Sequence, residues 1–255
     1  MEGNQVRSML TEYIYDGTFE GFLCCVYAHY YEGKAGSITK VNEDSQQAFF
    51  TGQVIVETDE DKAMTVYHAI EKKISTFDLR RAYRIFLCDS PGKEMTLLNY
   101  LRFGFIKGSY VSNYHGNPIV RDAELLEKKV TRELDRLKGL LRFSVLEGNI
   151  LYAEVEPDNN ILEFLAPHFS DRYKSEAFII HDLKRDRAVI SKGGRWYISE
   201  FKPEDVPDLH DDEIRYRALW RDYFDHIAIK ERTNPRCQKQ FMPVRYWKHL
   251  TEMQR

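Results

Sequence analysis

Cations and aromatic side chains are concentrated near the end of this chain, which is otherwise acidic. The segment from Ile229 to His249 contains six Lys or Arg residues and one Glu, whereas the whole chain of 255 residues has a formal net charge of -3. Lys and Arg contact phosphates, and Tyr, Trp and Arg side chains stack on exposed bases. This basic-aromatic tail therefore predicts a nucleic-acid-binding surface. We expect its contacts to come from Arg232, Asn234, Arg236, Arg245, Tyr246 and Trp247.

The same tail also has a purely structural interpretation. A segment that contains prolines can be held to its domain by burial of Tyr246 and Trp247, while Asn234 caps a turn before Pro235. Both interpretations hold together if the aromatic residues anchor the tail and the arginines face solvent. The sequence leaves the two open.

Three residues are candidates for acid-base chemistry. His168 precedes Asp171 by three residues, a helical spacing at which the two side chains can share a proton, and Asp16 is a further candidate near the start of the chain. Each has a simpler explanation, because Pro167 indicates a helix break beside His168 and Asp16 begins an ordinary turn. The catalytic residues, and whether the protein is an enzyme, therefore stay unknown.

The sequence offers little support for a metal or cofactor. Cys24, Cys25, Cys88 and Cys237 lack the spacing of zinc or iron-sulfur ligands. The acidic segment 203–213 can be imagined as a metal site, but solvated acids that lead into a helix explain it more simply. The chain contains no phosphate-binding loop, dinucleotide fingerprint or hydrolase motif. We expect no metal and no cofactor.

The bulk composition is that of a globular protein, with 43% apolar and 30% charged residues. The start of the chain lacks the pattern of a signal peptide, and no window reaches the roughly 18 consecutive apolar residues that a membrane span requires. These features predict a cytoplasmic protein without a membrane partner.

Apolar spacings of three and four residues predict helices over 19–30, 59–74, 79–88, 94–105 and 119–141. Thr18 or Asp16 is the expected cap of the first helix and Thr58 that of the second. Short strands are expected at 13–17 and 53–57. The first part of the chain is therefore predicted to be rich in helix.

The pattern then alternates, which indicates strands. Gly148-Asn149 predicts the turn of a hairpin, and a helix over 160–173 separates it from a second hairpin over 177–190 and a strand over 196–199. A last amphipathic helix ends near residue 227. We predict an α+β fold, with a helix-rich region over 1–141 and, over 142–255, a small antiparallel sheet, a C-terminal helix and the basic-aromatic tail.

Three segments carry a resemblance to one family. They are the stretch Tyr15–Tyr27, the stretch Leu165–Arg172, and the tail, with Arg-x-Asn-Pro-Arg at 232–236 and Met-Pro-x-Arg-Tyr-Trp at 242–247. Together they resemble the bacterial DUF4130 family, whose members are described as probable DNA metabolism proteins, and the resemblance extends over nearly the whole chain. The family offers no established catalytic residues to carry over.

The resemblance implies a role in DNA repair or modification. Members of this family are neighbours of a putative radical S-adenosylmethionine (radical SAM) protein, and the domain is also fused to uracil-DNA glycosylases. The first hypothesis is therefore a DNA-associated accessory protein that binds DNA and cooperates with a radical SAM partner. The alternatives are an enzyme that acts on damaged bases or nucleotides, and a module that only docks onto the partner.

Overall fold

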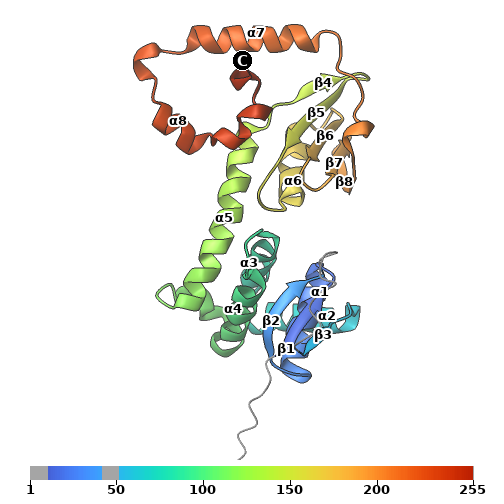
Figure 1. The fold of residues 1–255 in the computed structure, drawn as a ribbon, viewed down its shortest axis with the longest axis vertical. Coiled ribbons are helices and arrows are strands. Elements are labelled where there is room, and N and C mark those ends of the chain that lie inside the picture. Colours follow the sequence, from blue (N-terminus) through green and yellow to red (C-terminus); the bar gives the residue numbers. More distant parts are fainter. Residues whose placement is uncertain (1–10, 42–51, 255) are drawn as a thin grey trace, which may run out of the picture. The chain divides into compact units, whose positions relative to one another are not determined.

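The computed structural model describes residues 11–41 and 52–254, and its residues cluster into two compact units, 1–130 and 131–255. The α+β class is confirmed, with helices and two small sheets (Figure 1). Helix α5 (Pro118–Leu140) contains the division between the units, and the predicted boundary after residue 141 lies just beyond the end of the same helix.

The N-terminal unit contains a three-stranded sheet with the order β2-β1-β3, formed by β1 (Thr11–Tyr15), β2 (Ala35–Lys40) and β3 (Gln53–Ile55). Both strand pairs are parallel. Helix α1 (Phe19–Tyr31) supplies the crossover from β1 to β2 that a parallel pair requires. Strand β2 was not predicted, because its sequence AGSITK lacks the apolar alternation that marks the other strands.

Three further helices, α2 (Glu60–Lys73), α3 (Thr76–Leu87) and α4 (Lys93–Lys107), complete this unit with a 3-10 segment (Gly108–Asn113). All three lie where the apolar spacing predicts them. The predicted cap of α2 is wrong: Asp59 accepts the amide of Lys62, while the Thr58 hydroxyl donates to Asp16. The predicted cap of α1 at Thr18 is confirmed, because its hydroxyl accepts the amide of Gly21.

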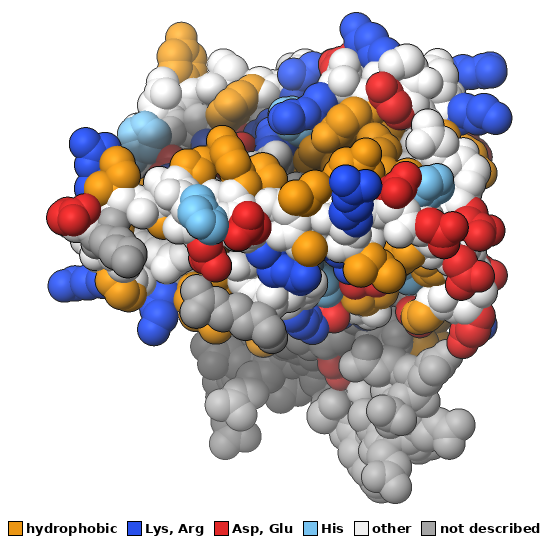
Figure 2. Space-filling model, turned by 90° about the horizontal axis from the view of Figure 1, so that it is seen from above, with side chains coloured by type: hydrophobic (Ala, Val, Ile, Leu, Met, Phe, Trp, Pro, Cys, Tyr) orange, Lys and Arg blue, Asp and Glu red, His pale blue; other side chains and the backbone are white. Residues whose placement is uncertain are grey.

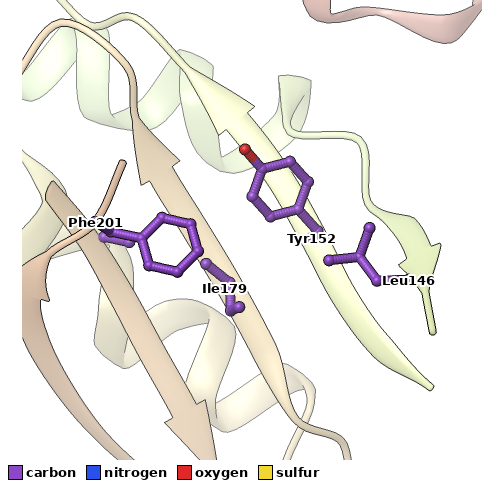
Figure 3. Close-up of a cluster of buried hydrophobic side chains, with 5 residues drawn as sticks. Leu146, Tyr152, Ile179 and Phe201 are labelled. Atoms are coloured by element: carbon purple, nitrogen blue, oxygen red, sulfur yellow. The ribbon is translucent and has the colours of Figure 1, made fainter. Parts of the chain in front are cut away.

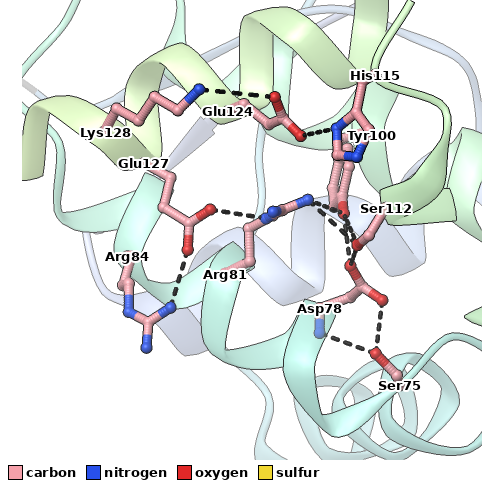
Figure 4. Close-up of polar contacts among 10 residues, drawn as sticks. All are labelled: Ser75, Asp78, Arg81, Arg84, Tyr100, Ser112, His115, Glu124, Glu127 and Lys128. Atoms are coloured by element: carbon pink, nitrogen blue, oxygen red, sulfur yellow. Dashed lines mark hydrogen bonds and ion pairs between the residues drawn. The ribbon is translucent and has the colours of Figure 1, made fainter. Parts of the chain in front are cut away.

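A buried polar network holds the helices of this unit (Figure 4). The Asp78 carboxylate, 1% exposed, accepts the hydroxyls of Tyr100 at 2.5 Å and Ser112 at 2.6 Å. Arg81 donates to Tyr100 at 3.0 Å and to Glu127 of α5 at 2.8 Å. Because buried charges are costly unless they are paired and hydrogen-bonded, this satisfied network has a structural role.

The C-terminal unit contains a five-stranded sheet in sequential order. Its strands are β4 (Ser144–Leu146), β5 (Ile150–Val155), β6 (Phe178–Asp182), β7 (Arg187–Lys192) and β8 (Arg195–Glu200). Three pairs are antiparallel, as predicted, but β5 and β6 are parallel, so the sheet is mixed. The reason is helix α6 (Leu162–Arg172), which crosses between these two strands.

Two tight turns fix the register of this sheet. Gly148 and Asn149 both have positive φ, at 76° and 62°, as do Gly193 and Gly194, at 59° and 74°. Gly193 and Gly194 form the two-residue loop between the paired residues Lys192 and Arg195, where two consecutive positive φ angles are expected. The β4–β5 loop is one residue longer, because residues 147–149 connect the paired residues Leu146 and Ile150. On one face of the sheet, Leu146, Tyr152, Ile179 and Phe201 pack into a buried cluster with Ala188 (Figure 3).

After β8 the chain is mainly helical. A 3-10 turn (Pro203–Asp205) leads to α7 (Glu213–Ile227), a second 3-10 turn (Lys230–Arg232) to α8 (Pro235–Phe241), and two more 3-10 segments (Val244–His249 and Thr251–Met253) end the described chain. The expected tail is therefore helical through most of its length. In residues 11–41 and 52–254, no helix is long and apolar enough to cross a membrane.

Candidate nucleic-acid interface

Asn234 and Pro235 begin helix α8. The side-chain oxygen of Asn234 accepts the amide of Cys237 at 3.0 Å, and Pro235 occupies the first turn, where its missing N–H costs nothing. Asn234 thus has the capping role that the structural interpretation assigns to it. Its side-chain oxygen already accepts a hydrogen bond within the chain.

Tyr246 and Arg245 are bound to the body of the C-terminal unit. Tyr246 is 2% exposed, and its hydroxyl donates to the Glu133 carboxylate on α5 at 2.6 Å. Burial, followed by the nearby Glu133 carboxylate, raises the pKa of Tyr246. Arg245 donates to the same carboxylate at 3.0 Å and pairs with Asp158. These two residues therefore fasten the tail.

Two further contacts between charged groups hold the tail against the end of β5 and the loop that follows it. Lys248 pairs with Glu156 at 2.5 Å, and Nδ1 of His249 lies 3.5 Å from Glu154. The acids Glu154, Glu156 and Asp158 alternate along the end of β5 and the loop after it, opposite the cations of the last 3-10 segments. The charges of Arg245 and Lys248 are thus neutralised within the chain.

Trp247 is also partly buried, and its indole N–H donates to the Met242 carbonyl at 2.9 Å. By contrast, Arg232, Arg236 and Lys239 are exposed, and none of the three has an ion pair with another residue in the described ranges. The structure therefore separates the tail into an anchoring set, 245–248, and an exposed cationic set: Arg232, Arg236 and Lys239.

The acid-base candidates are not brought together. His168 and Asp171 both lie on the exposed side of α6, where Asp171 pairs with Lys174 at 4.0 Å. The predicted helix break at Pro167 is wrong, since α6 continues through it. Among the described residues no hydrogen bond joins His168 to Asp171.

Asp16 has a structural role at the start of α1. Its carboxylate accepts the Thr18 amide and hydroxyl, at 2.9 and 2.6 Å, and the Thr58 hydroxyl at 2.7 Å. Partial burial raises its pKa, but these hydrogen bonds outweigh it and the net pKa is lowered. A carboxylate held in this way is a weak base, which argues against catalysis by Asp16.

The acidic segment before α7 is used in local contacts. Asp205 accepts the amide of Lys202, and Nδ1 of His210 accepts the amide of Asp212. Within the described chain, no three His, Cys, Asp or Glu side chains are placed to hold a metal ion. Cys24, Cys25 and Cys88 are buried free thiols, and Cys237 is an exposed one.

A groove along α7 offers a different interface. Its volume is about 600 Å³, and its lining includes the partly exposed rings of Tyr216, Trp220 and Tyr223, with Arg142 and Arg217 beside them. The rings of Trp220 and Tyr223 lie 5.7 Å apart between centroids. Figure 2, which views the molecule from the end where α7 lies, shows apolar side chains interspersed with both basic and acidic ones.

Buried carboxylates position the groove. Glu213, at the start of α7, accepts the Val145 amide and the Arg217 guanidinium, both at 2.9 Å, which fixes the helix to β4. Glu252 accepts the Trp220 indole N–H at 3.1 Å and Arg142 at 2.6 Å. The indole edge is therefore bound while part of the ring stays accessible.

The sequence contained a signal for this groove. Tyr216, Trp220 and Tyr223 have the spacings 4 and 3, which place them on one side of a helix. Spacing alone favours an ordinary amphipathic face that packs on the protein. In the structure, Glu213 is the buried residue of α7, and the aromatic face remains open.

Fold and groove together define an α+β protein with an open aromatic groove that Arg142 and Arg217 also line. A model of the DUF4130 family, a domain of unknown function, matches residues 91–252, and the chain belongs to this family. The matched region contains the segments 165–172 and 232–247 but not 15–27. No curated protein matches the chain.

Proposed function

We propose that this protein binds single-stranded DNA through the groove along α7 and acts in the cytoplasm as an accessory protein of DNA repair or modification. The observation that carries the proposal is the set of exposed rings at Tyr216, Trp220 and Tyr223 in one groove. Aromatic side chains stack on unpaired bases of any sequence, whereas the bases of a duplex are already stacked on each other. A single strand is therefore the preferred ligand.

Phosphate contacts would come from cations that are not neutralised within the chain. Arg142 and Arg217 are paired with Glu252 and Glu213, so they form part of the wall of the groove without adding net positive charge to it. Arg232 and Arg236 are exposed on the segment that follows α7. Of the three arginines expected from the sequence to contact phosphate, Arg232 and Arg236 are kept in this proposal and Arg245 is not.

The radical SAM partner enters the proposal through the family resemblance, and α7 offers it a surface. Ile214 and Ile227, at opposite ends of α7, are 72% and 49% exposed. Exposed apolar side chains of this kind favour a protein contact. Partner docking on α7 is therefore the second candidate function, and it predicts that Ile214→Ser and Ile227→Ser reduce binding of the partner without changing the affinity for DNA.

Fluorescence anisotropy with a labelled oligothymidylate tests the main proposal. Wild type should bind with an affinity that falls steeply as salt increases. Tyr216→Ala with Tyr223→Ala should weaken binding at every salt concentration, while Arg232→Glu with Arg236→Glu should weaken it and flatten the salt slope. Lys192→Glu with Arg195→Glu, a double charge reversal at the β7–β8 turn, is the matched control. Equal loss in this control would reject the groove as the binding site.

A further inference from the structure

A second, smaller hollow adjoins the aromatic groove in the C-terminal unit. Its volume is about 250 Å³, and Arg142, Arg217 and Thr251 line both hollows. The two hollows share these three residues and therefore lie next to each other in the C-terminal unit. The volume is below the roughly 300–1,000 Å³ of pockets for larger ligands, so its occupant must be small.

The hollow has one apolar and one polar side. Leu146, Val206 and Leu209 supply apolar surface, while Tyr152, Glu154 and His249 supply polar groups. A nucleobase has the same division, with apolar faces and a hydrogen-bonding edge. Bases that are read singly are held in this way, with apolar contact on the faces and hydrogen bonds at the edge.

Glu154 is the polar group that can discriminate between bases. Its two oxygens receive only long contacts, 3.4 Å from the Tyr152 hydroxyl and 3.5 Å from Nδ1 of His249. His249 lowers the pKa of Glu154 against the opposing effect of burial, so the group remains a carboxylate, which accepts and does not donate. Carboxylates accept from the exocyclic amino group of cytosine, whereas thymine presents a carbonyl oxygen at that position.

We propose that this hollow holds one unstacked base of the bound strand and prefers cytosine over thymine through the Glu154 carboxylate. The inference rests on the proposed strand binding and adds base selection to it. Tyr152 and His249 act as positioning residues, because they contact Glu154 and set where its oxygens lie.

The test compares labelled oligothymidylates with and without a single central dC. The two pyrimidines have similar stacking surfaces, so a difference in affinity reports the edge of the base. Wild type should bind the dC strand roughly tenfold more tightly, as expected for one good base contact. Glu154→Gln should abolish this preference, because the amide can also donate to the thymine carbonyl.

Val206→Trp and Leu209→Trp, which fill the hollow from its partly exposed apolar side, provide two independent controls. Each should remove the preference for dC, with the fold checked by thermal unfolding. Equal binding of both strands by wild type, or a preference that survives both filling variants, would overturn base selection while strand binding stands. Absence of strand binding at low salt would reject the proposed function and this inference together.

Discussion

The hydroxyl of Tyr246 donates to Glu133 across 2.6 Å, which joins residues 113 positions apart in the sequence. Glu133 is 3% exposed and also accepts the backbone amides of Asp158 and Asn159, each at 2.8 Å. The Glu133 carboxylate on helix α5 therefore links the tail and the loop after β5 to this helix. The contact changes the interpretation of the tail, because an aromatic residue expected to stack on a base is instead part of the folded core.

We predict that Tyr246→Phe lowers the free energy of unfolding. A hydrogen bond to a charged group contributes about 1.5–3 kcal/mol, and its loss leaves Glu133 with one donor fewer. Chemical denaturation measures the change. Tyr223→Phe removes an exposed hydroxyl from the groove and should be nearly neutral. Equal stability of Tyr246→Phe and wild type would contradict the anchoring role.

Arg245 and Arg236 should respond differently to charge reversal. Arg245→Glu places a third carboxylate beside Glu133 and Asp158 and should lower the melting temperature. Arg236→Glu should leave the melting temperature unchanged and reduce the affinity for DNA. Thermal unfolding and anisotropy of the same two preparations provide the comparison. If Arg245→Glu reduced the affinity for DNA and Arg236→Glu lowered the melting temperature, Arg245 would be the phosphate ligand instead.

The hydrogen bonds of the Asp16 carboxylate with Thr18 and Thr58 predict a pH-dependent contribution to stability. Because the pKa of Asp16 is lowered in the folded protein, its contribution is present above the unfolded pKa of about 3.9 and is lost as pH falls through the lowered folded pKa. Asp16→Asn should therefore be less stable than wild type at pH 7. The difference should narrow in strongly acidic solution, as measured by denaturation across pH. A difference that is constant with pH would contradict this account.

Glu252 links stability to the shape of the groove. Glu252→Gln removes the charge that pairs with Arg142 and should weaken the hydrogen bond from the Trp220 indole, because a neutral amide oxygen is a weaker acceptor than a carboxylate. The intrinsic tryptophan fluorescence should change and the affinity for the strand should decrease, since Trp220 loses its fixed orientation. Asp222→Asn alters an exposed acid on the same helix and serves as the control. Unchanged strand affinity in Glu252→Gln would remove Trp220 from the binding surface.

Local signals predicted most elements of this fold. The 4, 4, 3, 4 spacing of apolar residues predicted α5, and Gly148-Asn149 predicted the first hairpin because positive φ is a local requirement. The parallel pairing of β5 with β6 was missed, since strand direction depends on which distant segments meet. Strand β2 was missed because its own sequence is small and polar and its pairing with β1 stabilises it.

The candidate site was less predictable than the fold. The tail and helix α7 both contain Tyr and Trp residues. Only their burial in the folded protein shows which of them anchor the chain and which are open to a ligand. Tyr246 is buried because Glu133 lies opposite it, whereas Tyr223 is 58% exposed because nothing in the described chain covers that side of α7. Such partners are distant in sequence, so residue type and spacing alone did not separate anchor from interface.

The most direct test of the central claim is the affinity of wild type and of Tyr216→Ala/Tyr223→Ala for single-stranded oligothymidylate at low salt. Stacking contributes about 1–3 kcal/mol per base, so loss of two rings should weaken binding by roughly 25-fold or more while the melting temperature is retained. An affinity equal to that of wild type would contradict the claim that the groove along α7 binds the strand.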